Sequence, residues 1–211
     1  PIGYFTKEEV RYMAEHLDLP NYDKKSTTGI CFIGKINLKD FLQQRLPAKK
    51  GRILGPSGER LGEHDGIMYY TIGQRIGPRY GIEIYRKPGI TSSKRWYVAS
   101  KNLKQKIIVV APEGHKILFR KRMAVKSFHF IRENEIEMKQ KLSKRRKSYL
   151  ARIRQVGELL PAKLGYDDNN KVFLVELKEG ITGVSQGQAV VLYDDIEVVG
   201  GGEIVFPELL K

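Results

Sequence analysis

The sequence has little cysteine, no long apolar run and a deficit of acidic side chains. Cys31 is the single cysteine, so no internal disulfide can form, and no CxxC or Cys/His cluster has zinc-ligand spacing. A lone thiol favours a reducing compartment, and we expect the cytoplasm, or the mitochondrial matrix for a eukaryotic source. No stretch approaches the roughly 18 apolar residues of a membrane helix, so no membrane partner is expected.

Nucleotide-binding loops are also absent. The sequence has no GxxxxGK[ST], no GxGxxG and no Ser-Gly-Gly-rich loop, the patterns whose backbone amides hold nucleotide phosphates. We therefore expect no cofactor on these residues and no metal. The chain begins at Pro1 with no apolar signal segment, and we expect it to be cut from something longer.

The charge balance is the first positive indication of function. The 38 Lys and Arg residues against 24 Asp and Glu give a net charge of +14. A field of that sign attracts polyphosphates, and such basicity is typical of nucleic-acid binders. A basic protein that is merely soluble, or one that contacts acidic lipid, is the alternative.

The first 48 residues have helical patterns. Residues 6–9, Thr-Lys-Glu-Glu, have the spacing of a capping box, and apolar residues then recur at helical spacing until Pro20. This predicts an amphipathic helix of about 11 residues with nothing local to cover its apolar face. A second short helix is expected just before Pro47.

From Lys49 onward strands dominate, and the fold class predicted is mixed, mainly β. Strands are expected at 51–54, 68–72, 95–99 and 106–110. Further strands at 122–130, 149–155, 163–166, 172–177, 189–193 and 196–199 predict a closed antiparallel barrel, which removes exposed edges. Asp194-Asp195 suits a tight turn, and the glycines at 200–202 are expected to break the pattern before a strand at 203–206. The domains expected are 1–48, 49–120 and 121–211.

Two places invite a catalytic interpretation. Cys31 lies in the apolar run Ile30–Ile33 and is most simply a core residue; thiolate chemistry would need a nearby cation or helix N-terminus. His64-Asp65 could act as a base for that thiol, but a structural His-Asp pair between two glycines is favoured.

The segment from Lys139 to Arg154 holds eight Lys or Arg and no acid. Strand alternation places Arg152 and Arg154 on one side, beside an expected mobile basic loop, which predicts a phosphate clamp for RNA. A solvated charged surface is the alternative. The cations of the run are Lys139, Lys141, Lys144, Arg145, Arg146, Lys147, Arg152 and Arg154.

Taken in order, the motifs resemble those of the tRNA-specific 2-thiouridylase family. Residues 1–11 resemble the stretch closing that family's ATP-pyrophosphatase domain, and Thr28–Gly34 resembles the loop of its sulfur-carrying cysteine. Matching motifs follow in the family's order and spacing up to about residue 110, and more loosely to 206. They are Phe41-Leu42, Leu46-Pro47-Ala48, Gly62–Gly66, Tyr70–Arg75, Trp96-Tyr97-Val98, Gly187-Gln188-Ala189 and Gly200–Gly202.

The resemblance implies a mechanism. In this family an ATP-dependent domain adenylates wobble uridine 34 of tRNAs with lysine, glutamate and glutamine anticodons, and a cysteine persulfide delivers sulfur to C2. An upstream sulfur-donor protein loads the persulfide, which is more acidic and more nucleophilic than a thiol. Carried over by position, Cys31 is the persulfide carrier. The resemblance places the ATP loop and the partner cysteine upstream of Pro1, so we expect a monomeric C-terminal fragment that is inactive alone.

For tRNA contact the family uses an arginine in an Arg-Tyr pair and a glutamine in a Gly-Gln motif. Arg154 and Gln188 match these positions, whereas Gln155 stands where the family has tyrosine. Two other readings stay open. One is a non-catalytic RNA-binding module with an inert Cys31, and the other is a barrel of translation-factor type with a protein partner.

Overall fold

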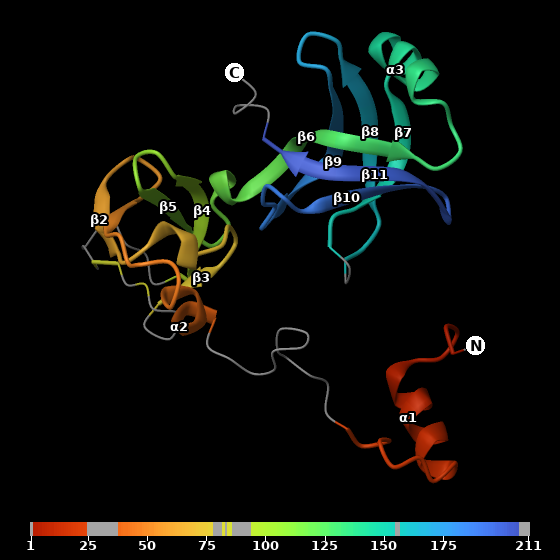
Figure 1. Cartoon of the computed structure of the whole chain (residues 1–211), viewed down its shortest axis with the longest axis horizontal. Coiled ribbons are helices and arrows are strands. Elements are labelled where there is room, and N and C mark those ends of the chain that lie inside the picture. The colour runs from red at the N-terminus through yellow and green to blue at the C-terminus, as the bar shows by residue number, and fades with distance from the viewer. Residues whose placement is uncertain are drawn as a thin grey trace. The chain divides into compact units, whose positions relative to one another are not determined.

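The computed structural model describes residues 2–24, 38–77, 82, 84–85, 94–154 and 157–206. The chain forms two compact units, Pro1–Leu46 and Pro47–Lys211, which are described separately below (Figure 1).

The first unit contains helices α1 (Lys7–His16) and α2 (Leu38–Gln43). The predicted capping box is confirmed: Thr6 Oγ1 accepts from the Glu9 amide, and the Glu9 carboxylate accepts from the Thr6 amide at 2.6 Å. No residue of α1 is buried, and Tyr12 is 61% exposed. Within the described residues, the apolar side chains of this helix are exposed or only partly buried.

The second unit begins with a five-stranded central sheet in the order β2-β1-β5-β4-β3. The β1–β5 pair is parallel and the other pairs are antiparallel. The strands are β1 (Gly51–Leu54), β2 (Arg60–His64), β3 (Arg75–Ile76), β4 (Trp96–Asn102) and β5 (Ile107–Pro112).

The strand predicted at 68–72 is wrong. Residues Ile67–Tyr69 form the short 3-10 helix η1, and the chain then turns at Gly73, whose φ is +83°. A backbone with φ in that region cannot continue a strand, so the glycine redirects the chain. The strands β2 and β3 were not predicted.

The rest of the unit is a closed six-stranded barrel, β10-β11-β6-β9-β8-β7 (Figure 1). The predicted barrel is thus confirmed. The 3-10 helix η3 (Lys116–Leu118) leads into it. Its strands are β6 (Phe119–Phe130), β7 (Lys147–Arg152), β8 (Leu160–Asp167), β9 (Val172–Thr182), β10 (Ala189–Asp194) and β11 (Glu197–Val205).

The three consecutive glycines do not break the last strand, which corrects the prediction. They lie inside β11, where a Cβ on Gly201 would come within 2.6 Å of the Val190 carbonyl oxygen and one on Gly202 within 2.6 Å of that of Lys126. The missing side chains therefore allow β11 to approach both neighbouring strands closely.

The mobile loop predicted within 139–147 is also wrong. Helix α3 (Glu135–Lys144) covers most of the run and packs against β8. Asn134 caps it by accepting from the amides of Ile136 and Glu137, and Met138 and Leu142 are buried in the barrel core at i, i+4 spacing. The helix was not predicted because only two of its residues are apolar and buried, and they lie among many charged residues.

Candidate functional site

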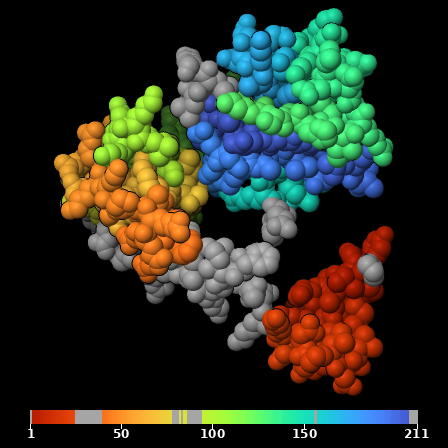
Figure 2. All heavy atoms as spheres, viewed as in Figure 1, coloured from red at the N-terminus to blue at the C-terminus, as the bar shows by residue number. Residues whose placement is uncertain are grey.

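A cleft of about 760 Å³ lies in the second unit, where loops of the central sheet meet one end of the barrel. Figure 2 shows the two parts as adjoining surfaces, orange to yellow-green for the sheet and green to blue for the barrel. We call this the cleft. Its lining residues are Thr71–Gln74, Tyr97, Val98, Glu113, Gly114, Leu118, Phe119, Arg154, Thr182, Gly183 and Gln188.

Two turns of the same construction line the cleft, one from each part. In the sheet, the Gln74 amide donates to the Thr71 carbonyl at 3.0 Å, and Gln74 Oε1 accepts from the Thr71 amide at 2.9 Å. In the barrel, Gln188 does the same with Ser185, at 3.4 and 3.0 Å. A glycine with φ near +80° precedes each glutamine, as type II turns require. In both turns the glutamine oxygen is used, which leaves the NH₂ group as the donor available to a ligand.

The two parts touch through backbone at the bottom of the cleft. A Cβ on Gly73 would lie 2.6 Å from the Cα of Gly183, which also has positive φ, +69°. No side chain fits between these residues. The contact therefore fixes how closely the loop of the sheet approaches the end of β9.

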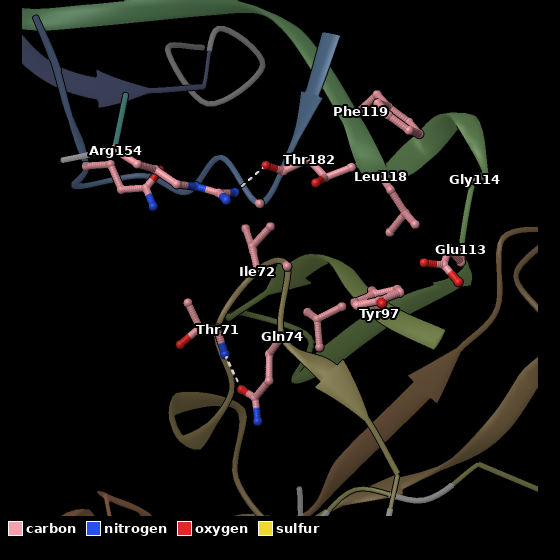
Figure 3. A pocket seen from close by; sticks show the side chains of 14 residues that line it. Thr71, Ile72, Gln74, Tyr97, Glu113, Gly114, Leu118, Phe119, Arg154 and Thr182 are labelled. Atoms are coloured by element: carbon pink, nitrogen blue, oxygen red, sulfur yellow. Dashed lines mark hydrogen bonds between the residues drawn. The ribbon is translucent and has the colours of Figure 1, made fainter. Parts of the chain in front are cut away.

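Arg154 extends from the end of β7 to this contact. Its Nη2 donates to the Thr182 carbonyl oxygen (Figure 3), and its guanidinium lies against Gly183. The side chain is exposed. Since a guanidinium has five N–H donors in a planar fork, the carbonyl uses only part of its capacity.

The rest of the lining is aromatic and nearly neutral. Tyr97 and Phe119 lie on the sheet side and at the start of the barrel, and Phe119 is 47% exposed. The charged side chains of the lining are Arg154 and Glu113. One exposed ring and one partly exposed ring, together with amide donors, suit an unpaired nucleobase, which stacks on aromatic rings and hydrogen-bonds through its edges.

The structure brings together two of the sequence-predicted RNA contacts, Arg154 and Gln188, in this cleft. Arg152 lies elsewhere: its guanidinium stacks 5.4 Å from the centre of the Tyr193 ring on β10. Buried Ile153 separates the two arginines, so they share the outer side of the barrel wall without sharing partners. Cys31 and Gln155 lie outside the described residues.

Several cations of the basic run are paired with carboxylates, so fewer of them are available to RNA than the sequence implies. Lys139 pairs with Glu135 at 2.6 Å and Lys141 with Glu137 at 3.6 Å along α3. Lys147 lies 3.6 Å from Asp194 and 4.7 Å from the centre of the Tyr149 ring, whose hydrogen bond raises the lysine's pKa. Arg146 pairs with Glu176. Within the described part of the chain, Lys144 and Arg145 have no carboxylate partner.

His64 has a structural environment. It is 3% exposed, and its Nε2–H donates to the Lys106 carbonyl at 3.1 Å, while Asp65 accepts from the Tyr70 hydroxyl at 2.6 Å. Burial lowers the pKa of His64, outweighing the Lys106 carbonyl and Asp65, which both raise it. A buried neutral ring with its donor occupied is poorly placed to take a proton from a solvent-exposed group.

The N-termini of the described helices α1 and α3 are acidic. Helices α1 and α3 both carry two glutamates in the first turn, which repel phosphate at the helix ends that otherwise attract it. Among the described residues, no group of three His, Cys, Asp or Glu side chains could hold a metal ion, and no helix is long and apolar enough to cross a membrane.

Sequence reasoning assigned no role to Gln74, Tyr97 or Phe119. The repeated pair Gly-Gln at 73–74 and 187–188 was the available signal for the first. For the aromatics no local signal exists, because their position in the cleft depends on how strands distant in sequence are placed.

Comparisons with known proteins agree with this organisation. Family models match residues 1–35 (tRNA methyl transferase HUP domain), 39–112 (tRNA methyl transferase PRC-barrel domain) and 120–204 (Aminomethyltransferase beta-barrel domain). The domain boundaries predicted at 48 and 120 stay predictions.

Several relatives named tRNA-specific 2-thiouridylase MnmA align with nearly the whole chain. The Streptococcus thermophilus protein is 39% identical over 206 residues, 97% of this chain and 51% of that protein. Those of Idiomarina loihiensis and Geobacillus kaustophilus are each 36% identical, over 97% and 100% of the chain and 52% and 53% of the relatives. The chain thus spans about half the length of the curated relatives it matches. It belongs to the tRNA-specific 2-thiouridylase family.

Proposed function

We propose that the chain takes part in 2-thiolation of the wobble uridine of tRNA and that its cleft holds unpaired nucleotides of that tRNA. The observation that carries the proposal is that Arg154, Gln188 and Gln74 line one cleft together with the partly exposed ring of Tyr97 and the exposed ring of Phe119. These groups supply a charge-assisted donor, two amide donors and stacking surfaces, the chemistry that single-stranded RNA recognition uses.

Cys31 is the proposed sulfur carrier, on the strength of the family relationship and its position in the motif Thr28–Gly34. The outer sulfur of a persulfide on its Sγ would attack the adenylated C2 of the uridine, and AMP would leave. Attack on Cys31 Sγ by the partner cysteine of the ATP-pyrophosphatase domain would then break the S–S bond, which leaves the sulfur on C2 and a disulfide between the two cysteines. ATP and the sulfur-donor protein are proposed to act through parts of the family's enzyme other than the described residues.

The RNA part of the proposal is tested by Gln188→Glu and Gln74→Glu, singly and together. A glutamate oxygen can still accept from the Ser185 or Thr71 amide, so the turn is kept while the NH₂ donor is replaced by a negative charge. Binding of the 211-residue chain to an unmodified tRNA transcript should weaken about tenfold or more per position, as a lost hydrogen bond near charge implies. Gln140→Glu, which adds the same charge on the exposed side of α3, is the matched control.

If the cleft variants bind tRNA as the control does, the cleft is not the RNA site. A wild-type chain with no measurable tRNA affinity would remove the whole proposal.

The carrier role is tested at the single thiol. Because Cys31 is the only cysteine, alkylation by iodoacetamide at neutral pH reports on it alone. A sulfur carrier should react as an accessible thiol in the folded chain. In a thiolation assay that includes the ATP-pyrophosphatase domain, Cys31→Ser should abolish 2-thiouridine formation and leave tRNA affinity unchanged.

An unreactive Cys31, or thiolation that survives its replacement, would favour the alternative of a non-catalytic RNA-binding module. The cleft supports that alternative equally, since none of its lining residues depends on the thiol.

A further inference from the structure

A second hollow, separate from the cleft, lies on the outer wall of the barrel and has a volume of about 750 Å³. We call it the groove. Five cations line it against one carboxylate, that of Glu176. The lining residues are Lys121, Arg145, Arg146, Ser148, Tyr149, Pro161, Ala162, Lys163, Glu176, Leu177 and Lys178.

Strand register builds the groove from four neighbouring strands. Glu176 on β9 lies opposite Arg122 on β6 and also opposite Lys163 on β8. Lys163 in turn lies opposite Ser148 on β7. These side chains therefore form one row across the outside of the barrel wall, and Lys178 lies two positions along β9 on the same side.

The single carboxylate of the groove is already occupied. Arg122 Nε donates to Glu176 Oε1 at 3.0 Å, and Arg146 donates to Oε2. The hydrogen bond from Arg122 is the largest of the effects that lower the pKa of Glu176. Among the described residues, Lys121, Arg145, Lys163 and Lys178 have no carboxylate partner. The groove is thus a cluster of cations without enough internal counter-charge.

The groove contains no stacking surface. Its one aromatic residue, Tyr149, is 5% exposed, and Lys147 covers its ring. Unpaired bases are held largely by stacking on aromatic side chains, whereas a base-paired stem presents its phosphates and hides its bases. Cations without exposed rings therefore suit duplex backbone.

The groove and the cleft lie at opposite ends of β7. Arg146 precedes the strand and Arg154 follows it, and eight steps of extended chain span roughly 26 Å. A single nucleotide cannot reach both sites, whereas a folded RNA with a loop and a stem can.

We propose that the groove binds the phosphate backbone of a base-paired stem of the tRNA whose unpaired nucleotides enter the cleft. This rests on the proposed function. The contact is to phosphate and carries no base specificity, so it positions the RNA and leaves reading of the bases to the cleft.

The test compares two probes, an RNA hairpin with a short loop and an unstructured single strand of equal length, over a range of salt concentrations. In the 211-residue chain, Lys163→Gln with Lys178→Gln should weaken hairpin binding several-fold. The slope of the logarithm of the binding constant against the logarithm of salt concentration should also become shallower by about 1–2, because each lost phosphate contact reduces its magnitude by about 0.9. Single-strand binding should be unchanged.

Lys104→Gln with Lys126→Gln removes the same charge from exposed positions that line neither site, and it should change the slope much less. A second variant, Ser148→Glu, adds a carboxylate to the groove while keeping every cation, and it should also weaken the hairpin selectively.

An unchanged hairpin slope in both groove variants would overturn the proposal, as would equal losses for hairpin and single strand. Loss of binding to anionic phospholipid vesicles with hairpin binding retained would assign the groove to a membrane surface instead. These results differ from failure of the proposed function, in which the unaltered chain binds no tRNA.

Discussion

The groove lies on the wall of the barrel and the cleft lies where loops of the central sheet meet one end of it, and the two sites have opposite chemistry. The cleft carries one cation and one acid, two glutamine turns and the exposed ring of Phe119, whereas the groove carries five cations, one acid and no exposed ring. The first suits bases and the second suits phosphates. The comparison shows that the net charge of the chain, +14, does not by itself identify the surface that recognises the bases of an RNA.

The largest expected effect comes from Gly73→Ala, which breaks the cleft and spares the groove. The new Cβ would lie 2.6 Å from the Cα of Gly183. Because that Cα is a backbone atom and not the end of a flexible side chain, it cannot move aside without shifting the chain. We expect a loss of unfolding free energy about 1–3 kcal/mol beyond that of a simple strained alanine, measured by urea denaturation. Single-strand RNA binding should fall sharply while the hairpin salt slope stays.

Gly58→Ala is the matched control for this change. Gly58 has a φ of +86°, close to that of Gly73, but a Cβ there meets nothing within 4 Å. Equal destabilisation by the two substitutions would show that the contact between Gly73 and Gly183 does not form.

A smaller, selective effect is expected for Phe119→Ala. Removing one stacking ring should cost about 1–3 kcal/mol of binding to single-stranded RNA and leave hairpin affinity nearly unchanged. Ile117→Ala removes a nearby exposed apolar side chain that does not line the cleft. If Ile117→Ala has the same effect as Phe119→Ala in filter binding, stacking in the cleft is not the cause.

The groove can be strengthened by Glu176→Gln. This change removes its carboxylate and releases Arg122 and Arg146 from their ion pairs, so hairpin affinity at low salt should rise a few-fold and the salt slope should steepen. The stability cost should be small, since such partly exposed pairs contribute about 0–1 kcal/mol. Glu179→Gln removes the same charge on β9 outside the groove; a gain as large from this control would point to a general charge effect.

The smallest effect concerns pH and belongs to neither site. Because burial lowers the pKa of His64 from 6.5, the unfolded chain takes up a proton there before the folded chain does. The contribution of the neutral His64 ring to the free energy of unfolding is fully present above pH 6.5, and it is lost as the pH falls toward the lowered pKa of His64 in the folded chain. The urea midpoint should drop between about pH 7.5 and about pH 5.5, less so in His64→Gln. An identical drop in the variant would assign the pH dependence to other groups.

The sequence predicted the barrel well because its strands alternate inward apolar and outward polar residues. It failed where a local pattern conflicted with long-range packing. Helix α3 presents only Met138 and Leu142 to the core, so its many charged residues led to the prediction of a loop. Gly201 was predicted to end a strand, although the close approach of β11 to its neighbouring strand requires a glycine there.

The two candidate sites were predictable to different degrees. Arg154 and Gln188 followed from the family resemblance, and the structure then placed them with Gln74 in one cleft. The groove was not predictable, because it depends on the register that sets Glu176 beside Lys163 and on an ion pair between Arg146 and Glu176, thirty positions apart. Charge counting along the chain cannot separate paired cations from free ones.

The most direct test of a tRNA lying across both sites is a hydroxyl-radical footprint of unmodified tRNA on the 211-residue chain. We predict two protected regions, one of unpaired nucleotides and one of stem backbone. Gln188→Glu should remove the first, and Lys163→Gln with Lys178→Gln should remove the second. If both variants lost protection of the same nucleotides, or if either variant kept the full protection pattern, the division of RNA binding between cleft and groove would be contradicted.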